Sequence, residues 1–137
     1  MSVMRSVEIE IDTQGRLVTD VTDRVTSFAR ADGGSGLLHV FLPHATAGLA
    51  LMETGSGSEG DLEDVIDAVL PREDRYRHRH GSEGHGADHL LPTFISPSLT
   101  LAVDNGRVVL GTWQGIVVVD TNRENNRRRI RLSFLEG

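Results

Sequence analysis

The sequence predicts an α+β domain, in which a mostly antiparallel β-sheet or sandwich carries two inserted helices. Two observations support the sheet: several segments alternate polar and apolar residues or are continuously apolar, and Asp104-Asn105-Gly106 is a hairpin signal between two of them. A third observation, apolar residues repeated at helical spacing in two other segments, adds the helices. The chain has 137 residues without an internal repeat or linker, so we expect one domain over residues 1–137.

The predicted strands are of two sequence types. The first and last strands alternate polar and apolar residues, which is typical of a strand with one buried face. The apolar runs near residue 109 and at residues 116–119 are continuous, which predicts strands buried on both faces. In chain order, the predicted strands are residues 6–12, 37–42, 48–52, 99–103, 108–110, 116–119 and 128–134.

The two predicted helices lie between these strands. Apolar residues recur at helical spacing within residues 21–29, behind Thr19 or Asp20 as a capping residue. The second helix is expected to start at Ser58, which is followed three residues later by an acidic residue in the pattern of a capping box, and to end at Pro71. The next segment, residues 72–88, has almost no apolar residue and is predicted to be a functional or disordered loop.

Composition excludes several classes of protein. A formal net charge of −6 argues against a general nucleic-acid binder, whose phosphate contacts need a basic surface. The sequence has no cysteine, so disulfides and thiolate metal sites are excluded, and a reducing compartment fits. The first residues lack the apolar core of a signal peptide, and no stretch has the roughly 18 apolar residues of a membrane span. We therefore expect a cytoplasmic protein without a membrane or nucleic-acid partner.

Histidine is the main candidate for chemistry. His44 lies between two predicted strands, His78, His80 and His85 lie in the polar segment, and His89 opens the next apolar run. Imidazole is the commonest metal ligand, and three imidazoles with one open position describe many catalytic zinc sites. No local motif fixes the geometry of these residues, so histidines on a solvated loop are the simpler alternative. For His39 we expect a sheet position with a satisfied hydrogen bond.

Charged residues suggest a second kind of site. A basic cluster in this acidic protein consists of Arg123, Arg127, Arg128 and Arg129. Strand alternation places Arg127 and Arg129 on one face and Arg128 on the other. Such a cluster is either a solvated edge or an anion clamp, because guanidinium matches the geometry of phosphate. Glu53 ends a predicted strand and is a candidate to orient an imidazole or to hold a metal ion.

From Pro43 onward the chain resembles the YjbQ-like family, also called the secondary thiamine-phosphate synthase family. Residues 44–49, HATAGL, resemble its H-T-S-A-x-L motif, and Tyr76-Arg77-His78 with His89 resembles its Y-x-H…H pair. Residues 110–116, LGTWQGI, match its L-G-T-W-Q-x-I signature, and the arginines at 127–129 resemble its R-x-R close. The resemblance covers nearly the whole chain and is firmest over residues 40–130.

This resemblance implies a compact homotrimer with sites where subunits meet. It implies that His44, His78 and His89 form the core of the site and hold a divalent metal ion such as zinc or magnesium. A further implication is that Glu53, Asp61 and Gln114 support those histidines, with Arg127 and Arg129 on phosphate. The family motif that surrounds Glu53 has asparagine on both sides, whereas Met52 and Thr54 stand there in this sequence, which puts the substrate in doubt.

The leading functional hypothesis is the transferase activity that the resemblance implies, thiamine-phosphate synthesis. Such a reaction joins a pyrimidine diphosphate to a thiazole phosphate and expels pyrophosphate, whose charge must be stabilised. One alternative is metal-dependent hydrolysis of a small phosphorylated metabolite. Another is a trimer that binds a metal ion or a ligand without catalysis.

Overall fold

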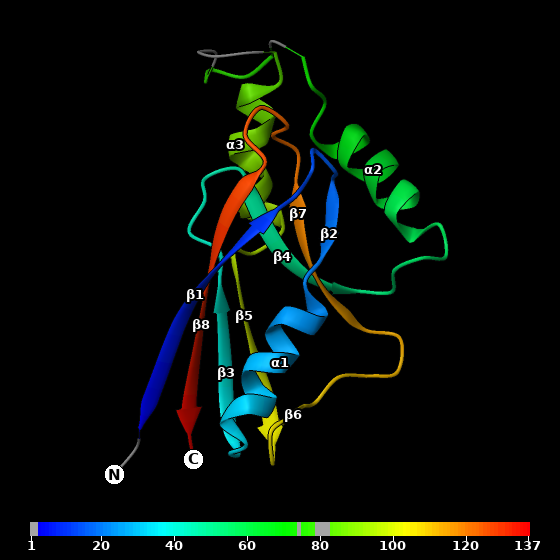
Figure 1. Ribbon diagram of the computed structural model, residues 1–137. Helices are drawn as coiled ribbons and strands as arrows, with labels where there is room; N and C mark the ends of the chain where they lie inside the picture. Colours follow the sequence, from blue (N-terminus) through cyan, green and yellow to red (C-terminus); the bar gives the residue numbers. More distant parts are fainter. Residues whose placement is uncertain (1–2, 74, 79–82) are drawn as a thin grey trace.

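The computed structural model describes residues 3–73, 75–78 and 83–137 of the chain (Figure 1). Within them, strands and helices follow the chain in an α+β order. The strands are β1 (Met4–Asp12), β2 (Val18–Asp20), β3 (Gly36–Phe41), β4 (Ala47–Met52), β5 (Ser98–Asp104), β6 (Arg107–Val108), β7 (Gly115–Asp120) and β8 (Arg127–Glu136). The helices are α1 (Thr22–Asp32), α2 (Ser58–Val69) and α3 (His85–Phe94).

The described strands form two antiparallel sheets. A five-stranded sheet has the order β1-β8-β3-β5-β6, and a three-stranded sheet has the order β2-β7-β4. The consecutive strands β3 and β4 do not pair with each other, because the chain passes from the first sheet to the second at residues 43–46. This passage places His44 at the junction of the two sheets.

Three layers result, with an apolar core on each side of the small sheet. The first core lies between the five-stranded sheet and the inner face of the small sheet, with Val25 and Ala29 of α1 packed into it. The second core lies between the outer face of the small sheet and the helices α2 and α3, through Ile66 and Leu91 among others. Figure 1 shows α2 beside β2, α3 beside β7 and α1 beside β6. The middle layer is therefore buried on both faces.

The β7 strand shows why the sequence there is continuously apolar. Ile116 and Val118 face the first core, whereas Val117 and Val119 face the second. All four side chains are fully buried. In contrast, β8 alternates strictly, so that Ile130, Leu132 and Phe134 are buried and the residues between them face outward. The predictions for both strands are confirmed.

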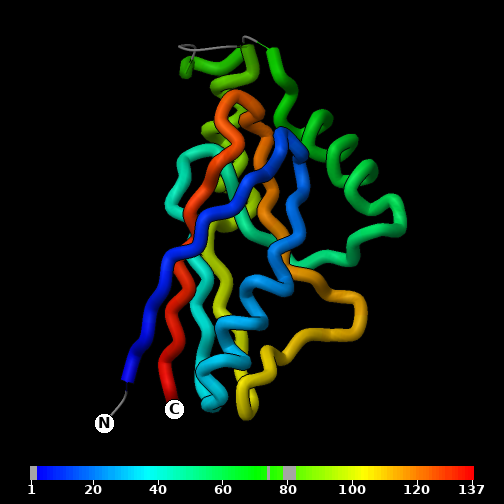
Figure 2. Tube along the Cα trace, in the orientation of Figure 1, coloured from blue at the N-terminus to red at the C-terminus, as the bar shows by residue number. Residues whose placement is uncertain are grey.

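The turn after β5 is also as the sequence predicts, and the structure shows in addition how the two ends of the chain pair. Asn105 and Gly106 both have positive φ angles, of 48° and 78°, which is the conformation that an Asn-Gly hairpin turn requires. The first and last strands lie side by side, with Met4 opposite Leu135, so both ends of the chain leave the same end of the five-stranded sheet (Figure 2).

The structure corrects several details of the sequence prediction. The described residues contain three helices rather than two, because α3 begins at His85, inside the segment predicted to be a loop. Ser58 is the first residue of α2 rather than its cap; the cap position is Gly57, which has a φ angle of 89° and makes no side-chain hydrogen bond to the helix. The strand expected at residues 108–110 is limited to Arg107–Val108. Val109, in the run that was predicted to be buried on both faces, is 53% exposed, so that prediction is wrong.

Among the helices in the described part of the chain, none is long and apolar enough to cross a membrane.

Candidate functional site

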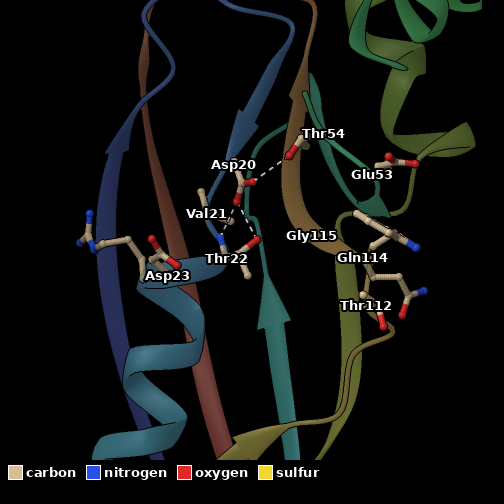
Figure 3. Close-up of a pocket in the computed structure, with 11 residues that line it drawn as sticks. Asp20, Val21, Thr22, Asp23, Glu53, Thr54, Thr112, Gln114 and Gly115 are labelled. Carbon is tan, nitrogen blue, oxygen red and sulfur yellow. Dashed lines mark hydrogen bonds between the residues drawn. The ribbon is translucent and has the colours of Figure 1, made fainter. Parts of the chain in front are cut away.

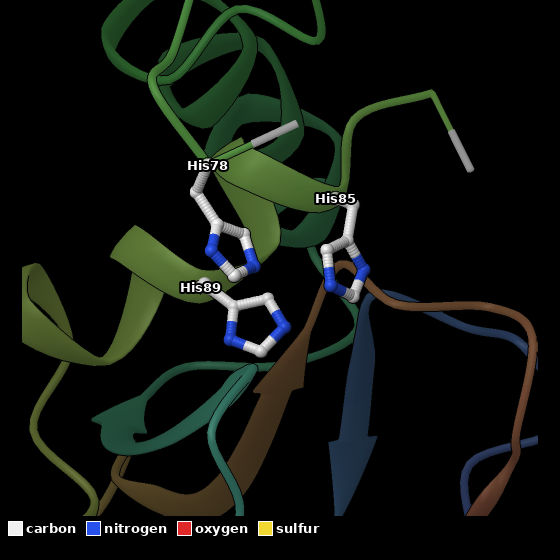
Figure 4. Close-up of side chains that lie close together, drawn as sticks. All are labelled: His78, His85 and His89. Atoms are coloured by element: carbon white, nitrogen blue, oxygen red, sulfur yellow. The ribbon is translucent and has the colours of Figure 1, made fainter. Parts of the chain in front are cut away.

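Three histidine rings come together at the N-terminal end of α3. His85 and His89 lie one helical turn apart on α3, at a spacing that places both side chains on one face. His78 reaches them from the segment before the helix (Figure 4). The ring centroids are 4.3 Å apart for His85 and His89, 4.6 Å for His78 and His89, and 4.9 Å for His78 and His85. We call this group the histidine triad.

The segment that carries His78 approaches α3 closely because Gly86 has no side chain. A Cβ atom at position 86 would lie 2.6 Å from the carbonyl oxygen of His78 and 2.7 Å from the Cβ of Tyr76, which is closer than real Cβ contacts allow. The hydroxyl of Tyr76 donates a hydrogen bond of 2.7 Å to the carbonyl oxygen of Pro71. Gly86 therefore permits the contact that brings the third ring to the other two.

An ion pair holds the start of α3 to the segment that follows α2. Arg72 pairs with Asp88, whose carboxylate is almost completely buried. The hydrogen bond from the Arg72 guanidinium to Asp88 raises the pKa of Arg72 above its usual value, and burial opposes this effect. This pair connects residue 72 to the helix turn between His85 and His89, so it helps fix where the triad is built.

The donor set of the triad fits a transition-metal ion. One ligand nitrogen from each ring can be chosen so that the three lie within 4.8 Å of one another. Three nitrogens bound to one zinc ion at about 2.0–2.1 Å are about 3.4 Å apart in tetrahedral geometry, so the rings must turn inward to share an ion. Imidazole suits zinc, copper, iron and nickel, whereas magnesium prefers oxygen ligands. The chemistry of the three side chains thus favours a zinc-type ion over magnesium.

The structure places His44 elsewhere, at the passage between the two sheets. Its ring lines a cleft with the arginines of β8 and is not among the three rings whose nitrogens converge. The Nδ1 atom of His44 lies 3.2 Å from the backbone nitrogen of Thr46, which donates to it, and 3.0 Å from the Thr46 hydroxyl. That hydroxyl donates in turn to Asp120, at 3.3 Å. His44 is therefore fixed by its own loop and by β7.

Burial and a neighbouring positive charge lower the pKa of His44. Desolvation is the largest cause, and the positive charge of Arg128 adds to it, whereas the Asp120 carboxylate opposes both. Arg128 and Asp120 form an ion pair whose side chains are 0% and 1% exposed. Because its pKa lies below the usual 6.5, His44 is neutral at physiological pH.

The cleft beside His44 contains both predicted phosphate ligands. Arg127 and Arg129 line it together with Arg131, all on the outward face of β8, and with Glu8 and Asn125. Arg127 and Arg129 thus lie on one face of β8, as strand alternation predicts, whereas the Arg128 side chain is buried. We call this region the arginine cleft.

Glu53 and Gln114 lie in a third place, an open cleft of about 470 Å³ between α1 and the loop before β7 (Figure 3). The Gln114 side-chain oxygen accepts a hydrogen bond of 2.8 Å from the backbone nitrogen of Gly111, so it closes the loop of the LGTWQ motif. Glu53 accepts a hydrogen bond from Ser56. Trp113 lines the same cleft and is 73% exposed. Asp61 lies in the first turn of α2 and lines neither this cleft nor the arginine cleft.

The predicted site residues are therefore divided among three places in one chain. His78 and His89 come together as predicted from the sequence, but the third ring beside them is His85 rather than His44. The sequence contains the signal for His85, since His85 and His89 are four residues apart, but that spacing indicates a shared face only where the segment is helical. Because the sequence predicts a loop over residues 72–88, the shared face of His85 and His89 was not predicted. His80 lies outside the described residues.

Comparison with known proteins identifies close relatives over nearly the full length. The sequence model of the family described as UPF0047 protein YjbQ-like matches residues 7–137. A UPF0047 protein of Mycobacterium tuberculosis is 57% identical over 129 residues, which cover 94% of this chain and 96% of the relative. The YjbQ protein of Escherichia coli O157:H7 is 31% identical over 123 residues, covering 88% of this chain and 87% of the relative.

Solved structures share the fold. A hypothetical protein from Aeropyrum pernix superposes with a TM-score of 0.87 and 29% identity, over 97% of this chain and 99% of that one. A protein of unknown function from Sulfolobus solfataricus has a TM-score of 0.91 over the full length of both chains. Its identity of 24% means that this second likeness concerns the fold alone.

Proposed function

The chain belongs to the YjbQ-like UPF0047 family, and we propose that it is a metal-dependent enzyme whose divalent ion is held by the histidine triad. The single observation that supports this is the convergence of ligand nitrogens from His78, His85 and His89 within 4.8 Å. A bound zinc ion would supply Lewis-acid stabilisation of charge on a phosphoryl oxygen, or would lower the pKa of a bound water to about 7. The protein residues would hold and orient that ion at the end of α3.

The substrate class that we propose is a small phosphorylated molecule in the cytoplasm. The triad and the arginines of β8 together offer the two kinds of group that handle phosphate, a metal site and guanidinium donors. The first reaction to test is the joining of a pyrimidine diphosphate to a thiazole phosphate with release of pyrophosphate, which the family resemblance implies. Hydrolysis of a phosphorylated metabolite is the second, because an ion held by the triad would supply the Lewis-acid chemistry that this reaction also needs.

We also propose a homotrimer, in which neighbouring copies bring separated clusters closer together. Two features of the single chain support this assembly. Trp113 is 73% exposed beside the cleft that contains Glu53 and Gln114. On the outer face of the five-stranded sheet, Met4, Leu135 and Leu37 form a row across three neighbouring strands, and each is more than 40% exposed. Light scattering after size exclusion tests the proposal, with three times the 15.0 kDa chain mass expected.

Metal content measured on purified protein tests the triad directly. We expect about one zinc-type ion per chain after stripping and reconstitution, and loss of that ion in His78→Ala, His85→Ala and His89→Ala. His39→Ala is the matched control, since His39 is an exposed histidine that is hydrogen-bonded to Thr100 on the surface of the sheet. Full occupancy retained in His89→Ala would contradict a histidine-held ion.

Activity assays then separate the candidate reactions. Pyrophosphate release from the two thiamine precursors, present in the metal-loaded protein and lost in His89→Ala, would support the transferase. Release of inorganic phosphate from phosphorylated metabolites, with the same dependence on His89, would support the hydrolase. A bound ion without turnover of any of these substrates would leave a metal-binding trimer and would contradict the proposed enzyme.

A further inference from the structure

Arg72 covers the start of α3, although it belongs to the segment that follows α2. Its guanidinium lies against the backbone of Gly84, the cap residue of α3, so that a Cβ atom at position 84 would lie 2.6 Å from Arg72 Nε. The Nη2 atom donates to the carbonyl oxygen of Glu83 at 3.4 Å, and Nη1 and Nη2 both donate to the carboxylate of Asp88. One side chain therefore contacts residues on both sides of His85, the first residue of α3.

The backbone on either side of this contact is anchored to α2. Leu70 is buried in the second core, and its backbone nitrogen donates to the carbonyl oxygen of Ile66 in the last turn of α2. The carbonyl oxygen of Pro71 accepts the hydrogen bond from Tyr76. Because these neighbours are fixed, the Arg72 side chain reaches α3 from a defined place.

Asp88 depends on Arg72 for charge compensation. Its carboxylate is almost completely buried, and Arg72 is its ion-pair partner in the part of the chain that the structure describes. The two residues line a cleft of about 390 Å³, whose other arginine, Arg123, pairs with Glu63. The remaining charged residues that line this cleft are Asp67, Glu83 and Glu124. Without the guanidinium, a buried carboxylate would lie unpaired among like charges, which is unfavourable.

The triad histidines on α3 are held by different parts of the structure. His85 is the first residue of the helix, so its position depends on the contacts at Gly84. His89 lies one turn further on and is followed by Leu91, which is fully buried in the second core. Helix ends fray before helix interiors. A disturbance at the start of α3 therefore displaces His85 before it displaces His89.

We propose that Arg72 is the positioning residue that keeps His85 in the histidine triad. The site offers three imidazoles only while the guanidinium lies on Gly84 and pairs with Asp88, and it offers two when that contact is lost. This inference rests on the proposed metal centre and adds a control on its number of ligands. Arg72 itself holds no ion, because a guanidinium has donors only.

Zinc affinity of the full chain, measured by competition with a chelator after removal of bound metal, tests the proposal. Arg72→Ala should weaken zinc binding by about 10–100-fold, the range for residues that orient metal ligands. Arg72→Lys should restore only part of the loss, because lysine keeps the charge and lacks the planar group that covers Gly84. Arg123→Ala is the matched control, since Arg123 lines the same cleft but pairs with Glu63, and it should bind zinc as the wild type does.

A double-variant cycle separates positioning from a general loss of stability. His85→Ala should weaken zinc binding strongly in the wild type and by less than about twofold in Arg72→Ala, where the ring is already displaced. Additive effects of the two substitutions would overturn the proposal. X-ray absorption at the zinc edge counts the ligands independently, with three imidazoles expected in the wild type and two in Arg72→Ala. Three imidazoles in both proteins would also overturn it.

A second variant guards against loss of the fold, because Arg72→Ala leaves Asp88 unpaired. Arg72→Ala combined with Asp88→Asn removes the buried charge but does not restore the cover on Gly84. We expect this double variant to fold, as measured by circular dichroism, and to bind zinc as weakly as Arg72→Ala does. Wild-type zinc affinity in the folded double variant would contradict a positioning role for Arg72.

Amide hydrogen exchange in the metal-free protein tests the role of Arg72 without any ion. The backbone nitrogen of Asp88 donates to the carbonyl oxygen of Gly84 at 2.9 Å and so closes the first turn of α3. Its exchange should be faster by about tenfold or more in Arg72→Ala and unchanged in Arg123→Ala. Unchanged exchange in Arg72→Ala would overturn this inference alone. Wild-type protein that binds no zinc would overturn the metal centre, and with it the ligand count, even if exchange responds as expected.

Discussion

Histidine side chains have different surroundings in the histidine triad and in the arginine cleft. In the triad, three rings from α3 and the preceding segment bring their ligand nitrogens within 4.8 Å, with glycine at position 86 allowing the close approach. In the arginine cleft, one ring is fixed by a backbone N–H and lies above a buried ion pair, between two sheets. The surroundings of each ring decide what chemistry it offers.

This difference shows why counting histidines is a poor guide to a metal site. Rings that share an ion need nitrogens that face one another, with hydrogen-free lone pairs directed at one point. In this chain the Nδ1 atom of His44 instead lies within hydrogen-bonding distance of the backbone nitrogen and the hydroxyl of Thr46.

The first prediction concerns the buried ion pair between Asp120 and Arg128, and it has the largest expected effect on stability. Asp120→Asn removes the charge that pairs with Arg128, whose side chain is fully buried. Leaving a buried guanidinium unpaired should lower the free energy of unfolding by about 3–5 kcal/mol. Urea denaturation at a fixed protein concentration measures this change.

A double variant provides the control for that prediction. Adding Arg128→Met to Asp120→Asn removes the unpaired charge and keeps an apolar side chain of similar length, so much of the lost stability should return. A single variant as stable as the parent protein would show that the ion pair does not support the junction between the two sheets.

The second prediction concerns the close approach that forms the triad. Gly86→Ala places a methyl group where the His78 carbonyl and Tyr76 now lie, so the segment with His78 must move away from α3. We expect the affinity for a zinc-type ion to fall by about tenfold or more, measured by competition with a chromogenic chelator.

Gly60→Ala is a suitable comparison, because this glycine lies in α2 and a Cβ there would meet no atom within 4 Å. The change should leave metal affinity unaltered and stabilise the helix by about 0.5–1 kcal/mol. Equal metal affinities for the two variants would argue against a site built on the approach of His78.

The third and smallest effect is a dependence of stability on pH. The pKa of His44 is lowered below 6.5 in the folded chain, so at mildly acidic pH the unfolded chain binds the proton more readily than the folded one. The stability that the neutral His44 ring confers is therefore fully present above the pKa that His44 has in the unfolded chain. This stability falls as the pH drops below that pKa.

His44→Gln should remove this contribution, and the difference in unfolding free energy between the two proteins should change most between pH 7 and the lowered folded pKa. Neighbouring charges also titrate or act on the ring, namely Asp120, Arg128 and the groups of the cleft, Glu8, Arg127, Arg129 and Arg131. The variant keeps all of them, so the comparison isolates residue 44. Parallel pH profiles would refute the lowered pKa.

The fold was largely determined by local sequence patterns. Alternation in β1 and β8, the apolar run of β7 and the Asn-Gly turn are properties of neighbouring residues, because strand periodicity and turn conformation act over a few positions. Family membership also follows from the sequence, since short motifs such as LGTWQ keep their spacing along the chain. In the same way, the outward direction of Arg127 and Arg129 follows from strand alternation.

The tertiary structure decided which residues meet. The start of α3 at His85 depends on the contact of Gly86 with Tyr76 and on the Arg72–Asp88 ion pair, and neither is visible in a local pattern. The separation of His44 from His78 and His89 depends on the passage of the chain from one sheet to the other at residues 43–46. Sequence spacing does not encode such distances, because they are set by the packing of segments that are far apart along the chain.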